Sequence, residues 1–171
     1  MEIVKYPDPV LRRSAEKITT FDSELQKTAS DMLNTMYTLK GVGLAAPQVG
    51  LGLSLLVLNP TGDPADTDEE LVLVNPEVVS RKHLEWDEEG CLSFPGIYAE
   101  VERHRDIVLR YQNLDGEDVE MKSTEFQARV IQHEMDHLQG ILFIDRMDAF
   151  IRTELKPEID TIQVETKKAL G

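Results

Sequence analysis

The 171-residue sequence predicts an α+β fold, in which mainly antiparallel sheets pack around a central helix that carries the pattern H-E-x-x-H. An N-terminal helix and a C-terminal helix complete this expected fold. Strand-like runs are grouped between the helical segments instead of alternating with them, which is typical of α+β proteins. The chain also contains no internal repeat and no long linker. Its length suits one hydrophobic core, so we expect a single domain over residues 1–171.

The first helix is predicted from about residue 23 to residue 40. Ser23 and Gln26 fit a capping box at its start, and Gly41 is a residue type that commonly ends a helix. Between them, apolar residues recur at helical spacing and form one stripe, made of Leu25, Ala29, Met32, Leu33 and Met36.

Two more helices follow in the second half of the chain. The central helix is predicted over residues 125–139, with Thr124 and Gln127 as a capping box and Gly140 as the stop. The last helix is predicted from about residue 148, and Pro157 should break or restart it because proline lacks the N–H that the helix requires.

The strands are predicted from short apolar or alternating runs, namely 53–58, 71–74, 107–112 and 117–122. Residues 61–70 between the first two runs are acidic and without periodicity, so they should form a long surface connection. Residues 113–116 end in Asp-Gly, which is a strong signal for a hairpin turn.

Composition and charge narrow the classes of function. The net charge is −14, which argues against a domain whose main task is to grip nucleic-acid phosphates. No run approaches the roughly 18 apolar residues that a membrane span needs. The first residues also lack the basic-then-apolar layout of a secretory signal. We therefore expect a cytoplasmic protein without a membrane partner or nucleic-acid specificity.

The sharpest chemical signal is His133-Glu134-Met135-Asp136-His137, which matches H-E-x-x-H. Residues four apart on a helix share one face, so both imidazoles can reach one metal ion. Glu134 then lies beside the open coordination position. Because residues 125–139 are independently predicted to be helical, we favour a metal site over two solvent-facing histidines.

A catalytic metal site usually has three protein ligands, and the sequence offers more than one candidate for the third. The extended pattern H-E-x-x-H-x-x-G-x-x-H fails because Phe143 stands at its last position. Cys91, the only cysteine, can supply a thiolate, which is a strong ligand for a borderline metal. Glu154 and Glu158 remain alternatives, whereas His83 and His104 are interpreted as ordinary surface histidines.

Three segments resemble the signature motifs of the peptide deformylase family, and they occur in the family's order and spacing. The first is Gly41-Val42-Gly43-Leu44-Ala45-Ala46-Pro47-Gln48, the second is Glu89-Gly90-Cys91-Leu92-Ser93, and the third is Gln132-His133-Glu134-Met135-Asp136-His137. The similarity extends over nearly the whole chain, to about Arg146.

This resemblance implies hydrolysis of the N-formyl group from the starting methionine of new polypeptides, with release of formate. It implies that Cys91, His133 and His137 bind one divalent ion. The family typically uses Fe²⁺, and Zn²⁺, Ni²⁺ or Co²⁺ can be found in preparations. Glu134 would take a proton from the attacking water and return it to the leaving amine. Gln48 and the backbone N–H of Leu92 would stabilise the developing oxyanion.

Formylmethionyl peptide is the substrate that the resemblance implies. We expect backbone contacts to the peptide at Gly43, Leu44 and Gly90, because glycine permits close approach and extended backbone can pair with an added strand. An apolar pocket for the methionine side chain is predicted from Phe126, Arg129 and Val130, with Tyr98 nearby.

Two other interpretations of the site, and one question about the C-terminal helix, remain open. A zinc endoprotease with Glu154 or Glu158 as third ligand would leave the first two segments unexplained, and a non-catalytic metal-binding domain would leave Glu134 and Gln48 without a task. In some family members a basic C-terminal helix docks on the ribosome. Residues 148–171 here carry four basic and five acidic side chains, a net charge of −1, which puts that docking in doubt.

Overall fold

The computed structural model describes residues 1–171, and its sheet is the framework for everything else. Five strands are hydrogen-bonded in the order β1-β2-β3-β4-β5, and every neighbouring pair is antiparallel. The α+β prediction with antiparallel strands is therefore confirmed, although the strands form one continuous sheet. Their bounds are β1 Gly43–Ala45, β2 Leu55–Leu58, β3 Leu71–Cys91, β4 Phe94–Gln112 and β5 Asp118–Thr124.

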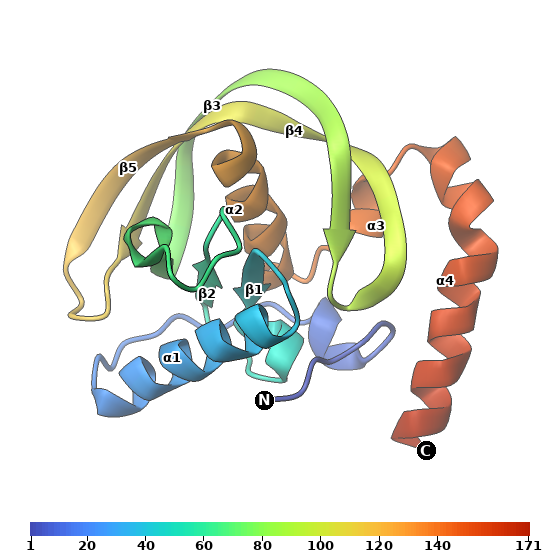
Figure 1. The fold of residues 1–171 in the computed structure, drawn as a ribbon, viewed down its shortest axis with the longest axis horizontal. Coiled ribbons are helices and arrows are strands. Elements are labelled where there is room, and N and C mark those ends of the chain that lie inside the picture. The colour runs from blue at the N-terminus through green and yellow to red at the C-terminus, as the bar shows by residue number, and fades with distance from the viewer.

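The two long strands are the main departure from the sequence prediction. β3 has 21 residues and β4 has 19, whereas only residues 71–74 and 107–112 were predicted as strand in these regions. Register shifts occur between Val74 and Glu77, between Val78 and Ser80, and between Gly90 and Cys91. Such irregularities bend a strand, and the two strands form an arch over α2 (Figure 1). Residues 82–88 are mostly polar and exposed, and the short alternation of Leu84 and Trp86 within them was not predicted as strand.

The helices agree with prediction in position and differ in their caps. α1 spans Ser23–Thr38 and α2 spans Glu125–Leu138, so the second contains His133 and His137. The cap of α1 is Asp22, whose side chain accepts the Leu25 N–H at 3.0 Å, and the predicted Ser23 capping box is wrong. Thr124 is the N-cap of α2 but makes no side-chain cap hydrogen bond.

Of the two glycines predicted to end helices, Gly140 does so as expected and Gly41 does so in a different way. Gly140 has a φ of +72° directly after α2, as a helix-ending glycine should. At the end of α1 it is Lys40, and not Gly41, that adopts the left-handed conformation, with a φ of +57°. The Gly41 N–H still closes the helix by donating to the Met36 carbonyl at 2.9 Å.

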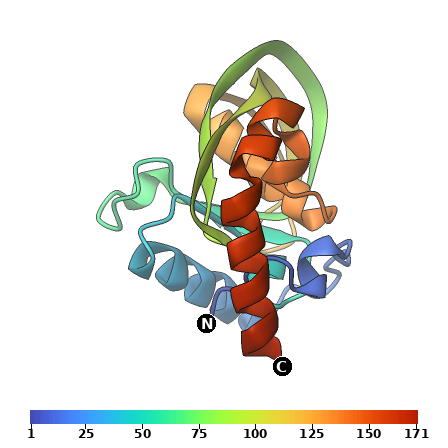
Figure 2. The same cartoon turned by 90° about the vertical axis from the view of Figure 1, so that its right-hand side faces the viewer.

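The C-terminal helix α4 runs without a break over Ala149–Leu170 after the short helix α3, Phe143–Arg146. Pro157 lies inside α4, so the predicted interruption there is wrong. Side chains before and after the proline pack against the same apolar cluster, including Leu155 and Ile159. This anchoring on both sides offsets the lost hydrogen bond. Figure 2 shows α4 running down the face of the molecule that is turned toward the viewer.

Smaller elements complete the chain: the 3-10 helices η1 (Pro9–Arg12), η2 (Ala46–Val49) and η3 (Thr67–Glu69). The turn at residues 113–116 forms as predicted, with the Gly116 N–H donating to the Asn113 carbonyl at 3.0 Å. η3 lies inside the predicted surface connection. No helix is both long and apolar enough to pass through a membrane.

The apolar interior is divided into three clusters, and one of them contains residues of α2. One lies between α2 and the sheet and includes Ile131, Leu56 and Leu109. Another gathers the N-terminal η1, the arch and α4 around Phe94 and Phe143. α2 is therefore held against the sheet by its apolar side chains, and the ring of His133 lies 5.7 Å from the ring of Phe143.

Candidate metal centre

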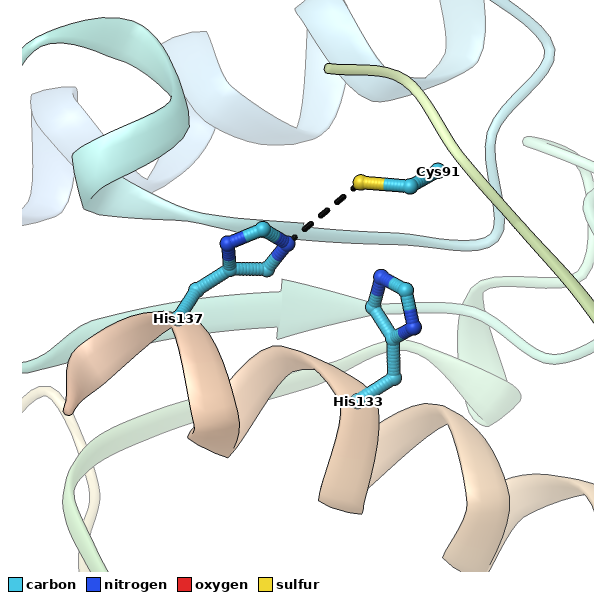
Figure 3. Close-up of side chains that lie close together, drawn as sticks. All are labelled: Cys91, His133 and His137. Atoms are coloured by element: carbon cyan, nitrogen blue, oxygen red, sulfur yellow. Dashed lines mark hydrogen bonds between the residues drawn. The ribbon is translucent and has the colours of Figure 1, made fainter. Parts of the chain in front are cut away.

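Three donor groups from two elements converge at the open end of the arch. Cys91 is the last residue of β3, and His133 and His137 lie one turn apart on α2. One donor atom from each lies within 4.8 Å of the others, and both imidazoles are buried. Figure 3 shows the sulfur of Cys91 above the two rings, with its Sγ 3.5 Å from Nε2 of His137.

The orientation of His133 is set by a carboxylate. Its Nδ1 lies 2.9 Å from Oε1 of Glu89, which leaves Nε2 as the nitrogen available for a metal. Burial alone would lower the pKa of His133, but hydrogen bonds to Cys91 and Glu89 raise it well above its usual range, so a metal that binds here displaces a proton from this ring. Burial lowers the pKa of His137 well below the usual range, so this ring is neutral and keeps a lone pair.

The donor set fits a divalent transition metal. Thiolate and imidazole together suit iron or zinc, and three protein ligands are typical of catalytic sites. Two buried polar atoms beside the donors, Oε2 of Glu134 and Nδ1 of His137, have no hydrogen-bond partner in the protein. Buried polar atoms are rarely left unpaired, so this site is one that further groups complete.

Glu134 lies between the two histidines in sequence and is 4% exposed. Burial raises its pKa to about 7, although the nearby His133 and Arg103 act in the opposite direction. A carboxyl group with a pKa near neutrality can both accept and return a proton. Gly43 makes room for it, because a Cβ at this position would lie 2.9 Å from Oε1 of Glu134.

Gln48 lies in η2, and its side chain reaches Cys91. Its Oε1 accepts the Ala45 N–H at 3.0 Å, which fixes the amide orientation. Its Nε2 is consequently directed at Oγ of Ser93, 3.3 Å away, and at Sγ of Cys91, 3.5 Å away. Leu92 follows Cys91 directly, so both groups predicted to stabilise an oxyanion lie beside the sulfur.

A buried ion-pair network lies behind the donors, and sequence reasoning missed it. Both oxygens of Glu89 accept hydrogen bonds from Arg103 at 2.9 Å, and Arg103 also pairs with Asp136. Burial favours the neutral form of Glu89, but hydrogen bonds from His133 and Arg103 lower its pKa to about 2. Asp136 in turn accepts two hydrogen bonds from Arg146, each 2.9 Å long.

Part of this network was visible in the sequence. Glu89 and Asp136 lie in the second and third motif segments, close in sequence to the proposed ligands Cys91 and His137. Their place in these segments could have indicated that they support the site. Arg103 carries no local mark, because only the pairing of β3 with β4 brings it to Glu89. Ser93, which holds Gln48 and donates to the Val4 carbonyl at 2.7 Å, was likewise missed.

A cavity of about 490 Å³ opens beside the donors and is also bordered by Cys91, His133 and Glu134. Six of the seven residues predicted to bind substrate line it: Gly43, Gly90, Tyr98, Phe126, Arg129 and Val130. The seventh, Leu44, has a fully buried side chain, so only its backbone in the edge strand β1 can meet a ligand. A larger, more open hollow of about 810 Å³ lies elsewhere and contains none of the donor groups.

The alternative ligands lie outside the donor cluster. Glu154 and Glu158 are exposed on α4, and neither belongs to the group of donors. His83 is exposed and its Nδ1 lies 2.7 Å from Oδ2 of Asp106. The backbone N–H of His104 donates to Oε1 of Gln132, and Nε2 of Gln132 donates to the His104 carbonyl. His83 therefore lies at the surface as the sequence predicts, whereas His104 is half-buried.

Comparison with known proteins agrees with this geometry. The family model described as polypeptide deformylase matches residues 1–152. A peptide deformylase of Acidobacterium capsulatum is 48% identical over 150 residues, which are 88% of each chain. The chloroplastic peptide deformylase 1B of Oryza sativa subsp. japonica is 43% identical over 100% of this chain and 64% of its own length.

Solved structures are similar over almost the entire chain. A single-site variant of Arabidopsis thaliana peptide deformylase 1B superposes with a TM-score of 0.96 at 40% identity, over 99% of this chain and 92% of that chain. A peptide deformylase of Plasmodium falciparum gives a TM-score of 0.95 at 36% identity, over 98% of both chains.

Proposed function

The chain belongs to the polypeptide deformylase family of metal-dependent hydrolases, and from this premise we propose that it removes the N-formyl group from formylmethionyl peptides and releases formate. The observation that carries the proposal is the buried Glu134, with a pKa of about 7, beside three converging donors at the edge of a cavity. We further propose that residues 1–171 form one catalytic domain.

In this proposal Cys91, His133 and His137 hold one divalent ion. The ion supplies Lewis acidity, which makes water nucleophilic near neutral pH and polarises a carbonyl oxygen. The protein's own contribution is the orientation of the donors: Glu89 fixes His133, and the burial of His137 keeps its ring neutral.

The proton transfers are assigned to Glu134. It would accept a proton from the attacking water and deliver that proton to the nitrogen of the leaving amine, which completes hydrolysis of the formamide bond. Its buried position supports this role, because desolvation raises its pKa to about 7, close to neutral pH.

Gln48 and Leu92 are assigned to the developing negative charge. The side-chain amide of Gln48 and the backbone N–H of Leu92 would donate to the formyl oxygen as it becomes an oxyanion. The amide of Gln48 is held on its other side by the Ala45 N–H, so this donor is preorganised before substrate arrives.

The peptide itself would occupy the cavity beside the donors. We propose backbone contacts from Gly43, Leu44 and Gly90, with the methionine side chain near Tyr98, Phe126 and Val130. Binding near the ribosome and a cytoplasmic location stay predictions, and the near-neutral charge of residues 148–171 gives no support to electrostatic docking through α4.

The test is hydrolysis of formyl-Met-Ala-Ser by protein of measured metal content, compared with cleavage of an internal peptide bond. We expect formate release from the first substrate and no cleavage of the second. Cleavage of the internal bond alone would favour an endoprotease, and the absence of both activities in metal-loaded protein would favour a non-catalytic metal-binding domain.

For the identity of the ion we propose Fe²⁺, by the resemblance to the family. Fe²⁺ and its thiolate ligand are open to oxidation, whereas Zn²⁺ and Ni²⁺ do not readily change oxidation state under these conditions. The iron-loaded protein should therefore lose activity in air over hours and keep it under nitrogen, while the other two forms stay constant. Equal decay of all three would rule out oxidation at the metal.

A further inference from the structure

Arg129 lies on α2 one helical turn before His133, and its side chain is 5% exposed. Its charged end is not free to line an apolar methionine pocket, as the sequence suggested, because it is bonded to protein groups. Nη1 donates to Oε2 of Glu89 at 2.8 Å and to the Val101 carbonyl at 2.7 Å. Nη2 donates to the Glu85 carbonyl at 2.9 Å.

These acceptors belong to both strands of the arch. Glu85 and Glu89 lie on β3, and Val101 lies on β4, opposite Asp87 in the strand pairing. A guanidinium is suited to this task because its donors lie in a rigid plane and point outward in several directions. A lysine ammonium at the same place is a compact point charge on a flexible stem and cannot span these three acceptors in one geometry.

The site needs such a clamp because its donors come from separate elements. Cys91 ends β3, while His133 and His137 lie on α2, so the spacing of sulfur and imidazoles depends on how β3 docks on α2. Arg129 bonds α2 to β3 at the Glu85 carbonyl and again at Glu89, which lies two residues before Cys91. The same carboxylate orients His133 through its other oxygen.

We propose that Arg129 is a positioning residue, which locks the arch to α2 and holds the Glu89 carboxylate so that His133 and Cys91 converge on one ion. This inference rests on the proposed function, because it assumes that these side chains bind a metal. Groups that orient metal ligands typically change metal affinity about 10–100-fold when they are removed.

The experiment compares cobalt binding by the wild-type chain, Arg129→Met and Arg129→Lys, using competition with a chelator of known affinity. The absorption of the Co²⁺–thiolate site provides a second readout of ligand geometry, independent of activity. Arg12→Met is the control: Arg12 also donates to a carboxylate, that of Asp145, and to a backbone carbonyl, that of Gly140, but it contacts no donor residue and its side chain is 42% exposed.

We expect Arg129→Met to bind Co²⁺ about 10–100-fold more weakly, with shifted absorption bands, and Arg129→Lys to lie between it and the wild type. Arg12→Met should lose thermal stability while it binds Co²⁺ like the wild type. If Arg129→Met does not fold, weaker binding and shifted bands in folded Arg129→Lys carry the same conclusion.

Two results would overturn the inference. A raised KM for formyl-Met-Ala-Ser with unchanged Co²⁺ affinity and spectrum would return Arg129 to the substrate pocket. A loss of thermal stability alone, as in Arg12→Met, would make it a structural residue only. Failure of the wild-type chain to bind Co²⁺ through Cys91 would instead contradict the proposed function itself, so the two failures are distinguishable.

Discussion

Helices α2 and α4 are both amphipathic, yet they bury different kinds of side chain. Nine of the 14 residues of α2 are buried, and five of these are charged residues or histidines: Arg129, His133, Glu134, Asp136 and His137. α4 is longer, with 22 residues, but buries only Ile159, Ile162 and Thr166. Its charged residues remain in solvent, for example in the exposed pair of Lys156 and Asp160.

This difference shows that the fold buries charged side chains and histidines on α2 and leaves the charged side chains of α4 in solvent. A buried charge is costly unless it is paired. Asp136 on α2 is paired with Arg103 on β4, and Arg103 is also paired with Glu89 on β3. Burial of Glu134 then shifts its pKa instead of simply weakening the fold. Changes around α2 should therefore act on metal binding and chemistry, whereas changes on α4 should act on stability alone.

The largest contrast is expected at the third metal ligand. Cys91→Ala removes the thiolate that faces α2, so it should strip the metal or weaken its binding severely. Glu158→Ala, on the exposed face of α4, should leave metal content unchanged. Elemental analysis of both variants after anaerobic purification is the measurement. Full metal occupancy in Cys91→Ala would remove this cysteine from the ligand set.

The next effect is expected at Glu134, which touches the chemistry without being a ligand. Glu134→Ala should keep its metal yet lose roughly 10²–10⁴-fold in deformylation rate, the range typical of a general acid–base group. Glu125→Ala, an exposed carboxylate on the same helix, is the control and should stay near the wild-type rate. Activity within a few-fold of wild type in Glu134→Ala would require another base.

On α4 the corresponding test concerns packing. Ile159→Ala removes a side chain that is 6% exposed and packs in the cluster around Phe94, so we expect a loss of about 2–4 kcal/mol in unfolding free energy. Val164→Ala, at an exposed position of the same helix, should change it by less than about 0.5 kcal/mol. Urea unfolding measures both. A fall in kcat of the folded Ile159→Ala protein would break the contrast between the helices.

The smallest effect on stability is expected at Asp145, in the segment that joins α2 and α4. Burial would raise the pKa of Asp145, but hydrogen bonds from Arg12 and from the Leu142 N–H lower it, with help from Arg152 at the start of α4. A lowered folded-state pKa gives stability that is present above the unfolded value, near 4, and is lost as the pH falls through the folded value. Solvent exposure limits this contribution to no more than about 1 kcal/mol.

Asp145→Asn should therefore be slightly less stable than wild type at pH 7, and the difference should shrink as the pH falls from about 5 to 3. Urea unfolding of both proteins at pH 7 and pH 3 is the measurement. A difference that stays constant over this range would show that the charge of Asp145 does not contribute.

The sequence by itself determined the position of the helices α1 and α2 and the pair of histidines that shares one face of α2. Apolar spacing located α1 and α2, and H-E-x-x-H on a helix required His133 and His137 to share one face. These conclusions hold because helical periodicity is a property of neighbouring residues. Gln48 and Cys91, far apart in sequence, were brought to the same site by resemblance to a family, and the structure places their side chains 3.5 Å apart.

Only the tertiary structure decided how long the arch is, how Pro157 is tolerated and where Arg129 points. Residues 82–88 are mostly polar, with only Leu84 and Trp86 apolar, and pairing with β4 makes them strand. Arg129 lines the cavity, as its place on α2 suggests, but the carbonyls of Glu85 and Val101 lie within hydrogen-bonding distance and fix its guanidinium. Contacts between residues that are far apart in the chain decide these three features. They cannot be predicted from the residues next to them in the sequence.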